Sequence, residues 1–200
     1  MANPALKLRF SPEAYLAWEA EQPEKHEYVD GEVFAMAGAT EGHVTVTGNM
    51  YMALRQHLKG SPYRTFMADM KVQAHADSGF YYPDVVVTCS ARDAKDPLVK
   101  REPSLLVEVL SSSTAAYDRG AKFSSYRQLP SLQEYVLIDI DTRATDVYRK
   151  GADGLWVLHP FASDEAVELA SVTLMIPAAV LFDELDLPAV AEAGVPAGQP

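Results

Sequence analysis

FYYPDVVVTC (residues 80–89) consists almost entirely of aromatic and β-branched residues, which are typical of a strand buried within a sheet. Only Pro83 and Asp84 interrupt that composition. Farther along the chain, a second apolar run, LLVEVLSSST (residues 105–114), contains Glu108. A buried carboxylate is costly unless it has a cationic partner, a neutralising proton or a metal ion. The two runs therefore predict two buried strands, each with an acid that needs a partner.

The two acids can face each other if the strands are neighbours. Side chains alternate between the faces of a strand, so Asp84 shares a face with Val86, and Glu108 shares one with Leu106. If the strands pair in register, both carboxylates reach one cation. Oxygen ligands of this kind suit Mg²⁺ or Mn²⁺, and Mg²⁺ takes only one or two protein carboxylates. We therefore expect a metal site at Asp84 and Glu108, completed by the backbone carbonyl of Val109.

Each acid also has a structural interpretation. An Asp that follows a proline is common where a strand begins or bends, and Asp84 can simply bond a nearby backbone amide. Glu108 can pair with a buried arginine. For either acid alone the structural interpretation is favoured. The presence of both, each within an apolar run, favours a shared site.

The composition describes an ordinary globular protein. The chain has 200 residues, of which 48% are hydrophobic and 22% are charged, which suits one domain with a sizeable core. Cys89 is the only cysteine, which excludes an intramolecular disulfide and a cysteine-rich zinc site. The first ten residues lack the apolar core of a signal peptide, and no apolar run has the length of a membrane span. We expect a cytoplasmic protein with no membrane partner.

The charge is unevenly distributed. The net charge is −11, which argues against avid, non-specific binding to nucleic acid. Residues 151–200 contain eight acids and no Lys or Arg, so the first 150 residues hold 17 basic and 20 acidic side chains, a net charge of −3. The body of the protein is nearly balanced and leaves room for a local basic groove.

The chain alternates between helical and strand-like segments. Helices are predicted over 11–22, 40–59 and 114–129; strands over 63–75, 80–89 and 104–112; and hairpins over 26–38 and 134–150. This order predicts an α/β fold with a mixed β-sheet flanked by helices. We expect a single domain over residues 1–186, followed by a disordered tail over 187–200, which is rich in small residues, Pro and Gly.

An ordered set of motifs resembles the Uma-two family of restriction endonucleases, which belongs to the PD-(D/E)xK nuclease superfamily. The motifs are Tyr82-Pro83-Asp84 before three valines, LVEVLS around Glu108, the series Asp118, Lys122 and Tyr126, EYVLID, and the pattern from Glu27 to His43. The resemblance covers roughly residues 10 to 180. It implies a restriction-endonuclease-like fold and hydrolysis of phosphodiester bonds in nucleic acid, with DNA as the expected substrate and Mg²⁺ or Mn²⁺ as the cofactor.

The sequence departs from the superfamily at the usual catalytic lysine. Leu110 occupies the position two residues after Glu108, and the resemblance implies that Lys122 takes the role instead. It also implies that Glu27 approaches the metal. From the residues alone, Lys122 can equally pair with Asp118 on a solvated helix face, and Glu27 can be an ordinary acid beside a hairpin.

Two functions therefore remain open. In the first, a metal-dependent endonuclease binds its metal through Asp84 and Glu108, and Lys122 and Glu27 complete the catalytic set. In the second, the protein is a catalytically inactive nuclease-fold module for binding or interaction, as the net acidity and Leu110 suggest. Since nucleases that cut both strands are often paired, we also expect a homodimer.

Overall fold

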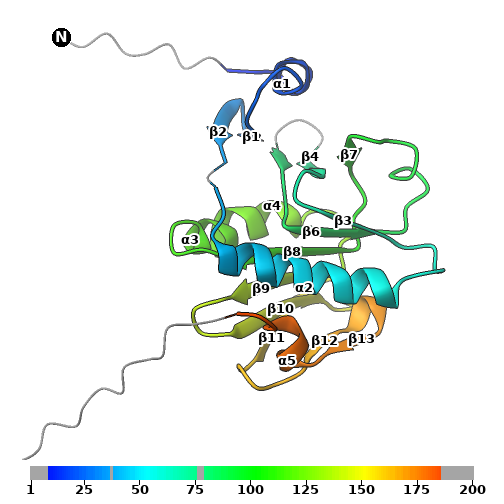
Figure 1. Ribbon diagram of the computed structural model, residues 1–200. Coiled ribbons are helices and arrows are strands. Elements are labelled where there is room, and N and C mark those ends of the chain that lie inside the picture. The colour runs from blue at the N-terminus through cyan, green and yellow to red at the C-terminus, as the bar shows by residue number, and fades with distance from the viewer. Residues whose placement is uncertain (1–8, 37, 76–78, 186–200) are drawn as a thin grey trace, which may run out of the picture.

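A computed structural model describes residues 9–36, 38–75 and 79–185, and its centre is a six-stranded mixed sheet (Figure 1). Its order is β11 (Trp156–Phe161), β10 (Ala144–Lys150), β9 (Glu134–Asp139), β8 (Leu105–Leu110), β6 (Val85–Thr88) and β3 (Arg64–Met67). Strands β8 and β9 are parallel, and the other neighbours are antiparallel. Strands β6, β8 and most of β9 are buried throughout, as expected of apolar runs at the centre of a sheet.

A five-stranded sheet lies above the central one in Figure 1. Its order is β2 (Glu32–Ala35), β1 (His26–Val29), β5 (Gly79–Tyr81), β4 (Lys71–His75) and β7 (Val99–Lys100). Helix α1 (Pro12–Glu19) covers it through an aromatic cluster that includes Tyr15, Tyr28 and Phe80. This sheet matters for function because β1 carries Glu27.

One face of the six-stranded sheet is covered by α2 (Glu41–His57), which begins at the N-cap Thr40. Its buried residues, among them Val46, Met50 and Leu54, pack on the odd-numbered side chains of β6 and β8. The same core includes side chains from β12 (Val167–Leu169), the 3₁₀ turn η2 (Ala170–Val172), β13 (Leu174–Ile176) and α5 (Ala178–Leu181).

The opposite face is covered by a helical segment that is shorter and less regular than the helix predicted over 114–129. It consists of α3 (Ala115–Tyr117), a π-helical turn η1 (Asp118–Lys122) and α4 (Phe123–Tyr126). Single π-helical turns are rare and often occur at functional sites. This one brings both of its end residues, Asp118 and Lys122, into the protein interior.

Two predicted strands prove to be pairs of strands in different sheets. Residues 80–89 divide into the end of β5 and all of β6, because the chain bends at Pro83 and Asp84. Asp84 therefore lies just before β6, rather than inside a strand as its apolar surroundings suggested. Residues 63–75 divide in the same way after β3, near Ala68, whose φ of 54° belongs to a turn.

The predicted fold class is confirmed. The hairpin turn at Asp30 and Gly31 has positive φ at both positions, as a type I′ turn requires, and it joins β1 to β2. The boundary of a single domain at residue 186 stays a prediction, and the tail expected over 187–200 lies outside the described residues. Among the described helices, none is long and apolar enough to cross a membrane.

Candidate active site

The two strand acids are brought together by the pairing of β6 with β8. Val85 pairs with Val107 in an antiparallel register, and one further step along that register sets Asp84 opposite Glu108. The backbone amide of Val109 donates a 2.7 Å hydrogen bond to Asp84 Oδ2, which ties Asp84 to the strand of Glu108. The convergence expected from strand alternation is therefore present in the structure.

Asp84 has a second partner at the start of α2. His43 Nε2 lies 2.8 Å from Asp84 Oδ1, and the side chains of the two residues are 18% and 20% exposed, respectively. The hydrogen bond to Asp84 raises the pKa of His43. Because the other acids of the site are more deeply buried, this pair marks the side on which the site meets solvent.

Lys122 lies among three carboxylates that come from different parts of the fold. Its Nζ is 3.0 Å from Glu27 Oε1 on β1, 3.1 Å from Glu108 Oε1 on β8, and 3.2 Å from Asp118 Oδ1. All four residues are less than a tenth exposed. The solvated Asp118–Lys122 surface pair considered from the sequence is therefore wrong, because the pair is buried and its ammonium is shared with two other acids.

Two tyrosines hold this arrangement in place. Tyr126, which is fully buried, donates a 3.0 Å hydrogen bond to Glu108 Oε1, and Tyr135 donates one of 3.0 Å to the backbone carbonyl of Asp118. Burial, together with the charge of Glu108, raises the pKa of Tyr126 well above its usual value, so its hydroxyl stays protonated and can donate. A spacing of four residues puts side chains on the same face of a helical segment. This spacing separates Asp118, Lys122 and Tyr126, which all point into the protein interior.

The cluster holds more negative than positive charge. Asp84, Glu108, Glu27 and Asp118 contribute four carboxylates, and Lys122 contributes one ammonium, which leaves a net charge of −3 when the carboxyls are ionised and His43 is neutral. Burial raises the pKa of Glu108 well above its usual value; Lys122 lowers it, whereas the other three acids raise it further. Burial alone would lower the pKa of Lys122, but Glu108, Glu27 and Asp118 together raise it well above its usual value.

These residues fit a divalent cation. In the described part of the chain, no three or more His, Cys, Asp or Glu side chains form a set arranged to hold a metal ion. Mg²⁺, however, needs only one or two carboxylates and keeps its waters. Lys122 and Tyr126 both donate to Oε1 of Glu108, and its Oε2 accepts no hydrogen bond from another described residue. That oxygen and the surplus negative charge are what a hard cation requires.

The structure thus brings Asp84, Glu108, Lys122 and Glu27 into one cluster. Asp118 belongs to it as well through Lys122, and His43 belongs to it through Asp84. Leu110, which stands where the superfamily has its lysine, is buried in the core. The ammonium reaches Glu108 from the helical segment instead.

A family model described as "Putative restriction endonuclease", named Uma2, matches residues 12–181. The chain belongs to the Uma2 family. Membership confirms the resemblance given by the motifs and supports a nuclease-type function for this Uma2 protein.

Two relatives and one solved structure are similar to this chain. The uncharacterized Synechocystis protein slr1290 is 38% identical over 174 residues, which is 87% of this chain and 92% of the relative. The uncharacterized protein sll1609, from the same organism, is 34% identical over 76% of this chain and 87% of its own length. A crystal structure of a putative nuclease belonging to DUF820 from Anabaena variabilis covers 88% of this chain and 99% of its own, with a TM-score of 0.73 at 18% identity. That likeness shows the fold.

The Lys122→Met substitution should destabilise the protein strongly. It removes the ammonium shared by Glu27, Glu108 and Asp118 and leaves their charges uncompensated in the interior. Breaking a buried ion pair in this way costs about 3–5 kcal/mol in the free energy of unfolding. Urea denaturation at neutral pH measures this cost, with the exposed Lys95→Met as the control. A loss of stability no greater than that of the control would contradict the shared ion pair.

His43 should make stability depend on pH. Since the folded-state pKa of His43 is raised, its contribution is fully present below the ordinary value of 6.5 and is lost as the pH rises through the folded value. The difference in melting temperature between the wild type and His43→Gln should therefore be larger at about pH 6 than at about pH 9. The same pair of measurements on His159→Gln, in β11, serves as the control. A difference independent of pH would refute the contact with Asp84.

Proposed function

We propose that this protein is an endonuclease that hydrolyses phosphodiester bonds of nucleic acid, with DNA as its substrate and Mg²⁺ or Mn²⁺ as its cofactor. One observation carries the proposal: three buried carboxylates share a single ammonium beside the partly exposed Asp84, in a chain that matches the family model described as "Putative restriction endonuclease". A purely structural ion pair has no need of the surplus negative charge, which makes burial more costly.

Asp84 and Glu108, with the carbonyl of Val109, would hold the ion. When bound, such an ion polarises the phosphodiester and makes a coordinated water more acidic. Asp84 is fixed for this role by the amide of Val109 and by His43, so that it needs little reorganisation. Glu108 is fixed by Tyr126 and keeps its second oxygen available.

Lys122 would supply the positive charge that stabilises the reacting phosphate. A preorganised ammonium in a site with little water is effective where negative charge builds up on phosphate oxygens. Glu27 and Asp118 keep that ammonium charged and oriented, since both raise its pKa and both lie within 3.2 Å of it. Glu27 therefore assists through Lys122.

The substrate would enter at the side marked by His43 and Asp84. These are the two most exposed members of the cluster. The scissile phosphate would meet Asp84 first, with Glu108 and Lys122 behind it in the drier part of the site.

We also propose that the protein acts in the cytoplasm as a homodimer. Among the described strands, β11 forms an outer edge of the six-stranded sheet and exposes Val157 (52%) and Leu158 (44%). An edge with exposed apolar side chains can pair with a second copy of the chain. Light scattering at micromolar protein concentration should give the mass of a dimer, and a monomeric mass would contradict the pairing.

Cleavage of DNA in the presence of Mn²⁺ tests the proposed activity. Purified protein should cut DNA in Mn²⁺ or Mg²⁺ and not in EDTA, and Asp84→Asn and Glu108→Gln should each lower the rate by at least about 100-fold. Glu108→Gln should also leave the melting temperature unchanged or raised, because it removes one of the excess charges. A structural carboxylate would show the opposite combination, with activity kept and stability lost.

The exposed Glu24→Gln makes the same chemical change away from the cluster and serves as the control. Cleavage that survives both site substitutions in a contaminant-free preparation would refute the assignment. If nucleic acid is bound but no metal supports cleavage, the inactive binding module is the correct function.

A further inference from the structure

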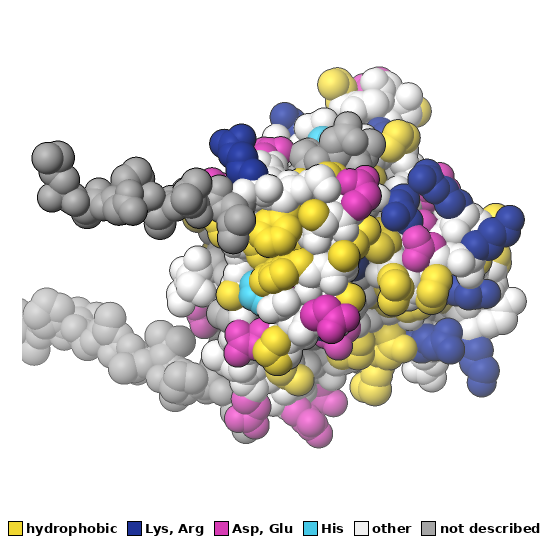
Figure 2. Space-filling model, turned by 90° about the horizontal axis from the view of Figure 1, so that it is seen from above, with side chains coloured by type: hydrophobic (Ala, Val, Ile, Leu, Met, Phe, Trp, Pro, Cys, Tyr) yellow, Lys and Arg dark blue, Asp and Glu magenta, His cyan; other side chains and the backbone are white. Residues whose placement is uncertain are grey.

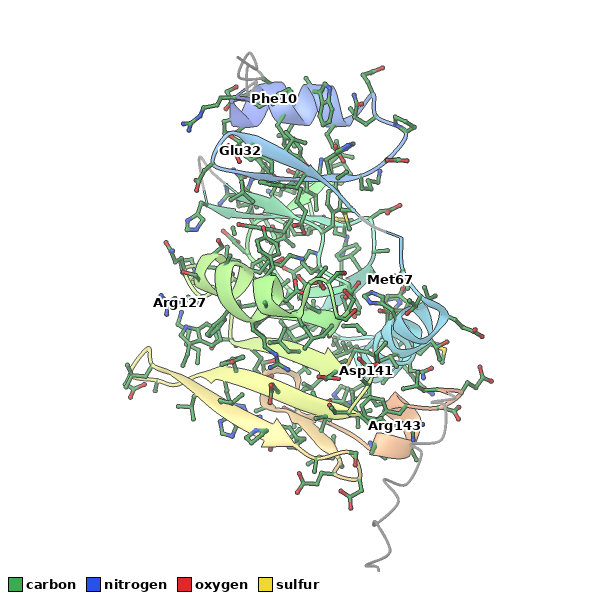
Figure 3. All side chains as sticks on the ribbon, turned by 90° about the vertical axis from the view of Figure 1, so that its left-hand side faces the viewer. Phe10, Glu32, Met67, Arg127, Asp141 and Arg143 are labelled. Atoms are coloured by element: carbon green, nitrogen blue, oxygen red, sulfur yellow. The ribbon has the colours of Figure 1, made fainter. Side chains whose placement is uncertain are left out.

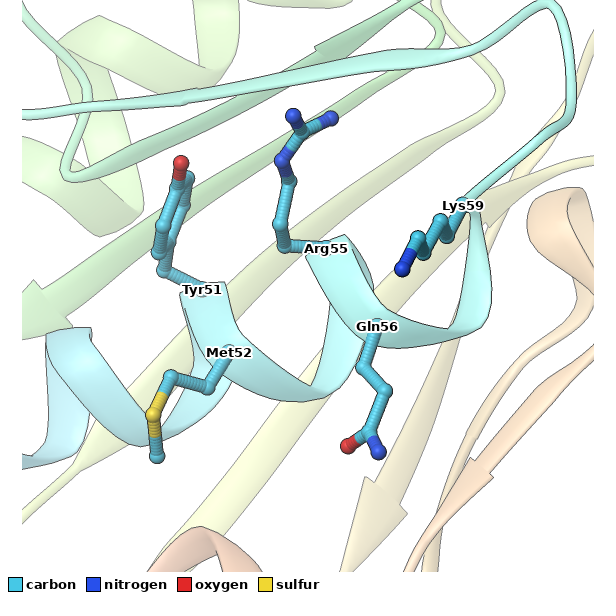
Figure 4. Close-up of a pocket in the computed structure, with 5 residues that line it drawn as sticks. All are labelled: Tyr51, Met52, Arg55, Gln56 and Lys59. Atoms are coloured by element: carbon cyan, nitrogen blue, oxygen red, sulfur yellow. The ribbon is translucent and has the colours of Figure 1, made fainter.

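An open groove runs along the exposed side of α2. It has a volume of about 420 Å³ and is lined by Tyr51, Met52, Arg55, Gln56 and Lys59. Figure 4 shows Tyr51 and Arg55 rising from the same side of the helix, with Lys59 beyond them at its C-terminal end. The groove therefore presents two cationic groups and a phenol to solvent.

The positive charge of this groove is uncompensated. Neither Arg55 nor Lys59 forms an ion pair or a side-chain hydrogen bond with another described residue. Three other arginines do have such partners: Arg101 with Asp96, Arg119 with Asp146, and Arg149 with Glu134. Figure 2 shows several Lys and Arg side chains along the right-hand edge of the molecule, with acidic side chains among them. In a protein of net charge −11, the groove itself carries two unpaired cationic side chains.

The groove and the candidate active site are joined by one rigid element. His43, in the first turn of α2, contacts Asp84, and Arg55 and Lys59 lie 12 and 16 residues farther along the chain. At 1.5 Å per residue, Arg55 is about 18 Å and the last helical residue, His57, about 21 Å from His43 along the helix axis, and Lys59 follows two residues after His57. Phosphates of one DNA strand are spaced about 3.4 Å apart along the duplex axis, so this span corresponds to roughly five to seven nucleotides.

We propose that Arg55 and Lys59 bind the phosphate backbone of the nucleic-acid substrate about five to seven nucleotides from the scissile bond. The number of nucleotides between these contacts and the scissile bond rests on the proposed function, since the scissile bond is placed at Asp84. The binding itself rests only on the exposed, unpaired charges. Contacts of this kind hold a substrate in place without reading its sequence.

Phosphate contacts in the groove would supply positive charge, of which the active site has too little to attract a polyanion. The surplus of buried carboxylates and the acidic C-terminal quarter repel a polyanion, so a substrate needs positive charge elsewhere on its path. The groove is close enough to the site to hold the same strand, and far enough to leave its carboxylates free for a cation. It therefore accounts for substrate binding by a chain whose overall charge opposes it.

Salt-dependent binding tests this proposal. Affinity of the wild type and of Arg55→Gln/Lys59→Gln for a DNA duplex of about 20 base pairs is measured over a series of KCl concentrations, with Ca²⁺ in place of Mg²⁺. Each phosphate contact contributes about 0.9 to the slope of log affinity against log salt concentration, so the double substitution should lower the slope by about 2. The dissociation constant at low salt should rise about tenfold.

A matched control keeps the charge change the same. Arg127→Gln/Lys150→Gln removes two positive charges from the other face of the six-stranded sheet, and Figure 3 shows Arg127 on the side away from α2 and Met67. This variant should bind with nearly the wild-type slope. Equal effects of the two double variants would mean that only net charge matters, and the proposal would be wrong.

Two other results would overturn the proposal. Arg55 and Lys59 lie near the C-terminal end of α2, where cations stabilise a helix. If Arg55→Gln/Lys59→Gln lowers the melting temperature and leaves the slope unchanged, the residues only support the helix end. If the wild type shows no salt-dependent binding, no phosphate is held. Binding is measured separately from cleavage. A protein that cleaves no DNA but keeps the predicted slope would therefore refute the nuclease function and support the phosphate contacts of Arg55 and Lys59.

Discussion

The ion pairs of Lys122 join separate parts of the fold at the candidate site. Its ammonium is shared by Glu27 from the five-stranded sheet, Glu108 from the six-stranded sheet and Asp118 from the π-helical turn. Three parts of the fold that are separate in sequence are thus fastened at one buried point. The point lies beside the bend at Pro83 and Asp84, where the chain leaves β5 in one sheet and enters β6 in the other. The bend therefore places the candidate site at the junction of the two sheets.

Burying this cluster costs free energy of folding, and that cost points to a functional role. Burying several carboxylates around one ammonium raises the pKa of Glu108 and opposes folding unless additional positive charge arrives. A hydrophobic core of the same volume would be more stable. The cluster is retained beside Asp84 and His43, which are the members that reach solvent, and this is the position where a cation and a phosphate can enter. Surplus negative charge within the cluster and unpaired positive charge on α2 therefore form a complementary pair of features.

The sequence predicts a large part of this picture. Strand alternation places Asp84 and Glu108 on matching faces, and the motifs identify the family and the fold. The division of residues 80–89 between two sheets could not be predicted, because composition does not reveal where an apolar run bends. The π-helical turn was also missed, since no local propensity distinguishes it from an α-helix. Only the tertiary structure shows that Glu27, more than ninety residues away along the chain, meets Lys122.

Anomalous scattering from crystals soaked in Mn²⁺ shows whether these carboxylates bind a metal ion. A single strong anomalous peak is expected between the carboxylates of Asp84 and Glu108, and it should be absent in crystals of Asp84→Asn. Lys122 should remain beside Glu27 and Asp118 when the ion is bound. Crystals that show no peak at this position, with the carboxylates still ordered around Lys122, would contradict the claim that the excess of buried negative charge is there to receive a metal ion.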